Sequence, residues 1–407
     1  GNVVNKGFRY YTEPSLWDDY RNKLVLLGML SPEVTVDVIQ SLIDKGEKTG
    51  FMPTFFHGDH AAPFIAGTYL RGIRGYDIKS AYNLLLRNAT VEGGTRPHIT
   101  EYMEKGFISE PDLENPGVET KAKAGVTKTL EYAYDDYALA LLAKELNDTE
   151  NYEMLMKRSR NYKNMFDPST GLMRGRLENG EWIKNFDPEY PYYEYMYREA
   201  NAWQSSFFAP HDPEGLIGLY KSKEAFEKKL DDLFTLPWKG IEAYNFSVFI
   251  GQYCHGNQPD HHVPYLYDYV GEPWKTQRMV RTIMSTMYGI GEKGFALPGM
   301  DDAGEMSSWY VFSALGFYPV APSTTNYAIG SPIFTKAVIH LPKYIYNGAT
   351  FTINANNASP ENIYIKTFAI DRKATGQTWI SHDDLAAGKT LTFEMSSEPD
   401  KTWGASE

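Results

Sequence analysis

The chain has 407 residues and a formal net charge of −12, with 40 Lys and Arg against 52 Asp and Glu. That acidic balance argues against a nucleic-acid partner, because nucleic-acid binders replace phosphate counterions with a basic surface. No run approaches the roughly 18 unbroken apolar residues of a membrane helix, and the single cysteine excludes an internal disulfide.

Apolar spacing in the first three quarters of the chain predicts paired helices. Ser31-Pro32 begins an apolar stripe that ends at Gly46, which supplies a cap, a first-turn proline and a terminal glycine. The spacing also predicts a helical hairpin over 130–142 and 152–162, and a helix behind Ser222. Further helices are expected over 15–28, 60–73, 76–91, 271–286 and 305–316.

The pattern changes near Gly330. From there, apolar and polar residues alternate in short runs separated by Asn, Gly and Asp, which predicts a meander of short strands. These runs are 337–341, 351–355, 363–365 and 391–395. We therefore expect a helical domain over 1–330 and a small β region over 331–407.

Aromatic residues make up 14% of the chain, and many stand beside acids and amides. Flat rings pack against sugars while acids and amides bind hydroxyl groups, so a carbohydrate site fits this composition, as does an aromatic-rich core. Long polar loops on a helical scaffold are where a site is expected. They cover 53–60, 167–201, 252–264 and 291–305.

Glu199 is flanked by Arg198 and lies close to Trp203. A carboxyl desolvated beside an indole has a raised pKa, as a general acid near neutral pH requires. A simple salt bridge to an arginine is the alternative.

Asp301 and Asp302 stand together between glycine-containing turns. One of these acids could activate water while the other holds a hydroxyl group or an ion; an Asp-rich turn is the alternative. If Glu199 and Asp302 face one bond, the pair describes glycoside hydrolysis.

The segment from His255 to His262 matches no standard zinc spacing. Asn257, Gln258 and Asp260 offer oxygen donors that suit a hard cation such as Ca²⁺, with a polar turn as the alternative. Asp135 and Asp136 are expected on the solvated face of their helix, with one of them facing a pocket as the alternative. We expect Cys254 to be a buried, inert thiol.

Taken together, these segments resemble glycoside hydrolase family 92, the calcium-dependent exo-α-mannosidases. The matching stretches stand in family order from about residue 11 to 404. They are SLWDDYR, HGDHAAPFIAGTYLRGIRGYD, TLEYAYDDYALALLAKEL, REANAWQSSFFAPHD, HGNQPDHHVPYLYDYVG, GMDDAGEMSSWYVFSALGFYPV and EMSSEPDKTWG.

The resemblance implies an (α/α)6 barrel with a C-terminal β domain, and removal of terminal α-linked mannose from glycans with inversion. Glu199 matches the family's general acid and Asp302 its general base, with Asp301 beside it. The HGNQP segment matches the calcium and sugar region, which implies Asn257 and Gln258 as metal ligands. Other matched positions near the terminal sugar are Trp17, Asp18, Arg21, His60, Trp203 and His255.

The chain departs from the family pattern at two positions and in its extent. Met300 stands where Asp or Asn is usual, and Gln258 where Glu is common. The family's N-terminal β-sandwich, which contributes to the leaving-group subsite, has no counterpart in the sequence. A non-hydrolytic mannose-binding relative, an incomplete fragment, and a barrel enzyme for another sugar are the alternatives. Family members act on external glycans, so a periplasmic or extracellular location is expected. Gly1 is typical of a processed end or tag scar, so the gene product is expected to be longer.

Overall fold

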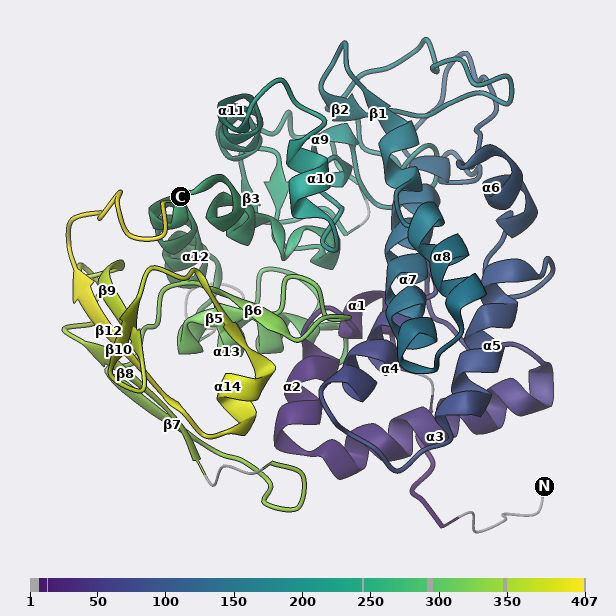
Figure 1. Cartoon of the computed structure of the whole chain (residues 1–407). Helices are drawn as coiled ribbons and strands as arrows, with labels where there is room; N and C mark the ends of the chain where they lie inside the picture. The colour runs from purple at the N-terminus through teal and green to yellow at the C-terminus, as the bar shows by residue number, and fades with distance from the viewer. Residues whose placement is uncertain (1–6, 13, 244, 291–295, 347–349, 406–407) are drawn as a thin grey trace.

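The computed structural model describes residues 7–12, 14–243, 245–290, 296–346 and 350–405. Its larger part is helical and a smaller β part flanks it (Figure 1). The α-helices are α1 Leu16–Asp19, α2 Lys23–Leu30, α3 Pro32–Thr49, α4 Ala61–Leu70, α5 Ile78–Thr90, α6 Ile99–Lys105, α7 Gly125–Glu145, α8 Thr149–Arg158, α9 Ala202–Ser205, α10 Pro213–Ile217, α11 Lys223–Thr235, α12 Pro273–Met287, α13 Glu305–Leu315 and α14 His382–Ala386.

Short 3₁₀ helices and strands complete the fold. The 3₁₀ helices are η1 Asn161–Met165, η2 Gln258–Asp260, η3 Val263–Val270 and η4 Asp302–Gly304. The strands are β1 Phe166–Asp167, β2 Leu172–Met173, β3 Phe249–Ile250, β4 Tyr253–Cys254, β5 Phe317–Tyr318, β6 Asn326–Ile329, β7 Lys336–His340, β8 Thr350–Asn356, β9 Tyr364–Ile370, β10 Lys373–Thr375, β11 Trp379–Ser381 and β12 Thr390–Ser396.

The helix signals in the sequence match the local structure. Pro32 occupies the first turn of α3 as predicted, but Gly46 is not the terminal glycine: α3 continues to Thr49, and Gly50 caps it with a left-handed φ of 87°. The predicted hairpin is α7 and α8, whose N-cap Asp148 accepts a hydrogen bond from Asn151 N. One expected helix is wrong: the 15–28 segment divides into α1 and α2. Asn22 interrupts it because its amide bonds Glu305 Oε1 at 2.5 Å, a contact far along the chain.

The helices pack in succession around a continuous core. α2 packs on α3 and α4, α4 and α5 pack on α7, and α13 packs on both α2 and α12. Buried apolar side chains from these helices form one cluster that continues into the β part. In the described part of the chain, no helix has the combined length and apolarity needed to cross a bilayer.

The C-terminal strands form a five-stranded sheet in the order β10-β9-β12-β8-β7 (Figure 1). The predicted alternation is confirmed, since buried and less buried residues alternate along β8 and β12. The predicted meander is wrong, because β12 inserts between β8 and β9 and runs parallel to β8. A second sheet pairs β6 with β5 and β11, so strands from both sides of Gly330 join in it.

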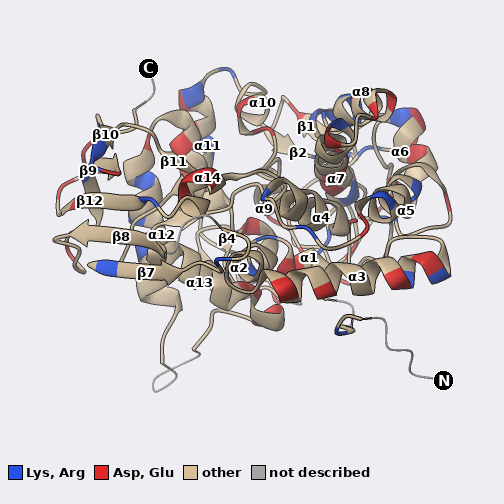
Figure 2. Ribbon diagram, turned by 60° about the horizontal axis from the view of Figure 1, so that its bottom comes forward, with Lys and Arg blue, Asp and Glu red and all other residues tan. Residues whose placement is uncertain are grey.

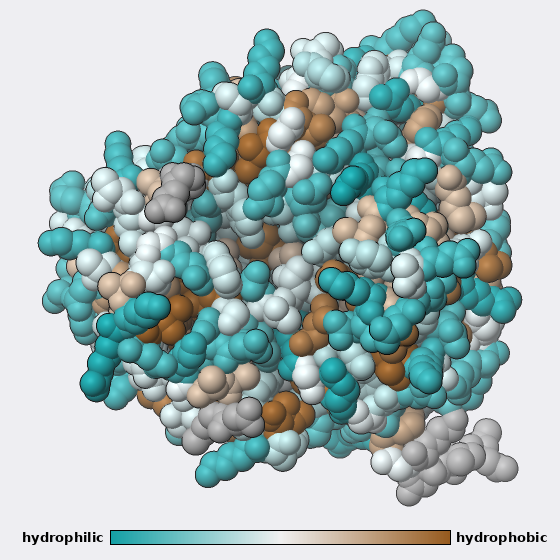
Figure 3. Space-filling view, in the orientation of Figure 1, coloured by the Kyte–Doolittle hydropathy of each residue, from teal (hydrophilic) through white to brown (hydrophobic). Residues whose placement is uncertain are grey.

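The surface is mixed in charge and polarity. Acidic and basic residues both occur along the outer helices, α3 among them (Figure 2). The face seen in Figure 3 is mostly hydrophilic, with apolar side chains gathered in separate patches.

Candidate active site

A cavity lies among α1, α7, α9 and the loops that precede α9 and follow β4. Of the residues predicted from the sequence, Trp17, Glu199 and Asn257 line it. Part of one predicted site loop, residues 291–295, lies outside the described residues. The other three predicted loops each bring residues to this cavity or its immediate neighbours, so we take it as the candidate active site.

Glu199 is held in a strained, buried position at this cavity. Its side chain is 3% exposed, and its φ of 46° lies in the left-handed region that non-glycine residues rarely adopt. Asn245 Nδ2 donates to Glu199 Oε2 at 2.8 Å. Burial raises the pKa of Glu199, against the lowering effects of Asn245, Arg198 and Asn257, and an ionised Asp302 raises it further. This environment favours the protonated carboxyl that a general acid needs.

Asp302 has the same kind of backbone strain, with a φ of 42°. Its Oδ2 accepts a hydrogen bond from Gln258 Nε2. Partial burial raises the pKa of Asp302, as do Glu305 and Asp301, while the bond from Gln258 and the nearby His261 lower it. Asp302 and Glu199 are close enough for the charge of one to shift the pKa of the other.

Two adjacent amides connect these carboxyls. Asn257 Nδ2 donates to the Glu199 backbone oxygen at 3.1 Å and lies 3.4 Å from Glu199 Oε2. Gln258 donates to Asp302 and, at 3.1 Å, to the backbone oxygen of Met300. The Met300 side chain is 60% exposed, so this residue joins the network through its backbone alone.

The same amides fit a calcium ion chemically. Both amide nitrogens donate to protein groups, whereas the Asn257 Oδ1 and Gln258 Oε1 atoms accept no hydrogen bond from any described residue. Amide oxygens are ligands that Ca²⁺ accepts, together with water and hydroxyl groups. The described residues contain no group of three or more His, Cys, Asp or Glu side chains suited to a metal.

A second polar cluster borders the cavity at Trp17. Its indole Nε1 donates to Glu131 Oε1 at 2.6 Å. His60 Nε2 lies 3.8 Å from the same oxygen, and His60 Nδ1 lies 2.8 Å from Asp135 Oδ1. Burial lowers the pKa of His60, but attraction to Asp135 and Glu131 outweighs it and raises the value to about 9. His60 also stacks on Tyr20 at 4.1 Å between ring centroids.

Arg21 and Asp18 lie beside this cluster. Arg21 lines an adjoining cavity of about 210 Å³, and Phe208 borders both cavities. The Arg21 guanidinium lies 4.8 Å from the Tyr20 ring centroid. Its Nε and Nη2 have no hydrogen-bond partner among the described residues. Burial raises the pKa of Asp18 to about 8, although Ser15 donates to its carboxylate at 2.6 Å.

Three other predicted residues are engaged with the protein itself. His255 has both ring nitrogens near tyrosine hydroxyls, at 2.7 and 2.9 Å, which fixes the loop that leads to Asn257. Asp301 Oδ1 accepts from the Ser307 amide and hydroxyl at the start of α13. The Trp203 ring lies 4.7 Å from Lys229 Nζ. Their roles toward a substrate stay predictions.

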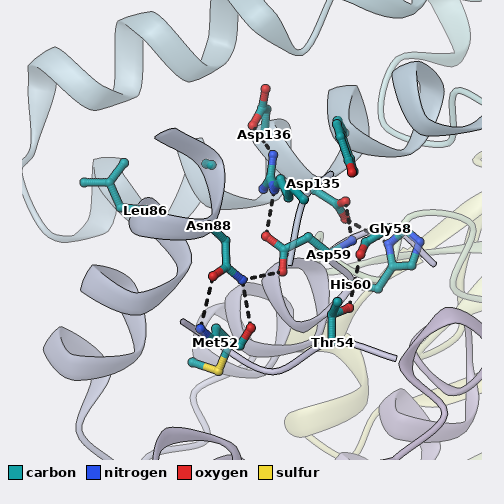
Figure 4. A network of polar contacts seen from close by, with 12 residues as sticks. Met52, Thr54, Gly58, Asp59, His60, Leu86, Asn88, Asp135 and Asp136 are labelled. Carbon is teal, nitrogen blue, oxygen red and sulfur yellow. Dashed lines mark hydrogen bonds and ion pairs between the residues drawn. The ribbon is translucent and has the colours of Figure 1, made fainter. Parts of the chain in front are cut away.

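The expectation that Asp135 and Asp136 face solvent is wrong, since both are 0% exposed. Asp135 binds His60 and the Asp59 amide, and Asp59 binds Arg96 (Figure 4). Arg96 also reaches Asp136 Oδ1 at 2.7 Å. Sequence position alone suggested a solvated face, but His60 compensates Asp135, and the buried arginines Arg96 and Arg158 compensate Asp136. The buried state expected for Cys254 is confirmed, and burial raises the pKa of its thiol to about 12.

The sequence analysis missed two polar residues near Glu199, Glu131 and Asn245, whereas it had named Asp260 as an oxygen donor beside Asn257 and Gln258. Glu131 and Asp260 line the cavity, and Asn245 binds the Glu199 carboxyl. Glu131 Oε2 has no hydrogen-bond partner among the described residues, although the side chain is buried. Glu131 lies in the family-like segment TLEYAYDDYALALLAKEL, so that motif could have identified it. Asn245 lies in none of the matching segments.

Comparison with known proteins identifies the family of the chain. The model of the glycosyl hydrolase family 92 catalytic domain matches residues 1–397. The chain belongs to glycosyl hydrolase family 92. This confirms the predicted family, and the likeness to family structures confirms the (α/α)6 barrel with a C-terminal β domain.

Two solved structures and one curated relative show how far the likeness extends. The family GH92 α-mannosidase BT3965 from Bacteroides thetaiotaomicron, in complex with mannoimidazole, is 34% identical with a TM-score of 0.91, covering 99% of this chain and 53% of that one. The inverting mannosidase BT2199 from the same organism is 31% identical with a TM-score of 0.86, covering 98% and 55%. An uncharacterized secreted glycosidase of Arthroderma benhamiae is 26% identical over 93% of this chain and 51% of the relative. The chain therefore spans about half the length of these relatives.

Proposed function

We propose that the protein is a calcium-dependent, inverting exo-α-mannosidase that acts on terminal α-linked mannose of external glycans. One observation carries the proposal: two consecutive amides, Asn257 and Gln258, each bind a different buried or half-buried carboxyl. Two carboxyls with separate environments at one site are the arrangement used for glycoside hydrolysis. The mannosidases among its relatives support mannose as the sugar, and the secreted relative supports an external location.

The two carboxyls take different roles because their surroundings differ. Glu199 is the more deeply buried, and the charge of Asp302 favours its protonated form. Glu199 therefore donates a proton to the oxygen of the leaving group. Asp302, half-buried and bonded by Gln258, accepts a proton from the attacking water. Water attack on the face opposite the leaving group gives inversion.

The residues that would hold calcium are Asn257 and Gln258, through their amide oxygens. Bound there, the ion would supply positive charge and coordination sites to sugar hydroxyls. The protein side chains contribute the rest of the sugar contact: Trp17 presents an indole at the cavity, and Glu131 presents a carboxylate oxygen that accepts no hydrogen bond from a described residue. Both suit a ring with an apolar face and several hydroxyl groups.

The direct test is to follow hydrolysis of an α-linked mannobiose by proton NMR, before and after exhaustive chelation. We expect β-mannose as the first product, loss of turnover after chelation, and recovery on adding Ca²⁺. First-formed α-mannose would contradict inversion. Undiminished turnover in metal-free protein would contradict the calcium requirement. Calcium-dependent mannose binding without any turnover would instead favour a non-hydrolytic sugar-binding protein.

A further inference from the structure

Two neighbouring phenylalanines stand out on the surface near the cavity. Phe55 and Phe56 are 50% and 41% exposed. The residues that follow them, from His57 to His60, are buried. Exposing two large aromatic side chains in sequence forgoes the free energy that their burial would provide. The two rings therefore offer an apolar contact surface in the described part of the chain.

Contacts place this pair at the rim of the candidate active site. The Trp17 amide donates to the Phe55 carbonyl oxygen at 2.6 Å. The Phe56 ring meets the Trp17 ring edge-on, with 5.7 Å between centroids. Trp17 itself lines the cavity. The two exposed rings thus continue the aromatic wall of the cavity toward solvent.

A second set of contacts ties Phe56 to the general acid. The Arg198 guanidinium lies 4.2 Å from the Phe56 ring centroid and 4.1 Å from that of Tyr193, so two rings hold it. Arg198 Nε lies 4.0 Å from Glu199 Oε1. Arg198 also lines the cavity. Phe56 therefore lies on the side of the site where Glu199 delivers its proton.

We infer that Phe55 and Phe56 form the leaving-group subsite, an aromatic surface that holds a neutral sugar through one of its apolar faces. The inference rests on the proposed function. In that reaction the leaving oxygen is the atom Glu199 protonates, so the departing sugar lies next to Glu199 and its neighbours. A sugar has C–H groups on its ring faces and no charge, which suits exposed rings at a rim. The preferred substrate class is thus a saccharide rather than a simple alkyl mannoside.

The test compares two substrates that differ only in the leaving group. An α-linked mannobiose offers a sugar to the rim, whereas α-mannosyl fluoride offers none. For Phe55→Ala and Phe56→Ala we expect the ratio of kcat/KM for mannobiose to kcat/KM for the fluoride to fall about tenfold, the effect of losing one apolar contact face. Phe334→Ala removes a ring that is also exposed, at 51%, in the loop between β6 and β7. It should keep the wild-type ratio.

The outcomes separate this inference from the proposed function. An unchanged ratio in both variants overturns the subsite, and so does an equal loss on both substrates, which indicates only a structural role. Wild-type protein that hydrolyses neither substrate contradicts the proposed function. In that case, calorimetry on Phe55→Ala and Phe56→Ala tests the subsite by measuring sugar binding in place of turnover. Weaker mannobiose binding with unchanged binding of methyl α-mannoside supports the rim, and unchanged mannobiose binding overturns it.

Discussion

Asn257 and Gln258 are neighbours in the chain, and their side chains point hydrogen-bond donors at two different carboxyls. Asn257 Nδ2 lies 3.4 Å from Glu199 Oε2, and Gln258 Nε2 binds Asp302 Oδ2. Glu199 and Asp302 are 103 positions apart in the sequence, yet both contact the short segment Asn257-Gln258. A movement of this segment therefore changes the surroundings of both carboxyls together.

Replacing Glu199 with Gln tests its role as the acid. The change keeps size and most hydrogen bonding but removes the proton, so kcat/KM on mannobiose should fall by about 10²–10⁴. A substrate with a fluoride leaving group does not need that proton and should lose far less. Glu194→Gln is the matched control, since Glu194 is about a quarter exposed and also lies near Arg198. Equal losses on both substrates would argue against acid catalysis by Glu199.

Replacing Gln258 with Glu separates calcium binding from the support of Asp302. A carboxylate binds Ca²⁺ more strongly than a neutral amide, so calorimetry should show a lower Kd for calcium. The same change removes the donor to Asp302 and places a second negative charge beside it. Turnover at saturating calcium should therefore fall, because the Asp302 pKa rises and less of the base is ionised. Tighter calcium binding with full activity would mean that the Gln258 donor is dispensable.

Local signals in the sequence predicted much of this molecule. Apolar spacing located α3 and the α7–α8 hairpin, and strand alternation located β8 and β12. Motifs brought Glu199 and Asp302 forward as the candidate pair. These features are readable because each depends on residues close together in the chain.

Features that depend on distant contacts were not predictable in this way. Asn245 reaches Glu199 across 46 positions, and Trp17 reaches Glu131 across 114. Asn22 breaks a helix because of a partner 283 positions away. No local pattern specifies such partners, and the burial of Asp136 likewise depends on where its arginines fold.

The His60–Asp135 pair predicts a pH dependence of stability. His60 has a pKa of about 9 in the folded protein, against an ordinary value of 6.5. Its protonation contributes up to about 3 kcal/mol to the free energy of unfolding. This contribution is fully present below about pH 6.5 and is lost as the pH rises through about 9. Urea unfolding between pH 6 and 10 should show this decline. The His60→Asn variant should have a lower free energy of unfolding at pH 6, and its free energy of unfolding should lack the part of the decline with pH that His60 causes. A parallel decline in wild type and variant would exclude His60 as the cause.

Asp136 is predicted to be a strong determinant of stability, because it compensates two buried arginines. Its carboxylate accepts from Arg96 Nη1 at 2.7 Å, and from Arg158 Nε at 2.8 Å and Nη2 at 3.0 Å. Asp136→Asn keeps the shape but removes the charge, so the free energy of unfolding should fall by about 3–5 kcal/mol.

The matched comparison for Asp136 is an exposed pair. Lys228 lies 2.9 Å from Asp232 and its side chain is 75% exposed, so Lys228→Ala should change the free energy of unfolding by no more than about 1 kcal/mol. Thermal and urea unfolding of both variants measure the difference. Similar small effects for Asp136→Asn and Lys228→Ala would mean that the charge of Asp59 alone compensates Arg96. A large effect confined to Asp136→Asn would show that each arginine of the network needs this carboxylate, since Arg158 has no other ion-pair partner among the described residues.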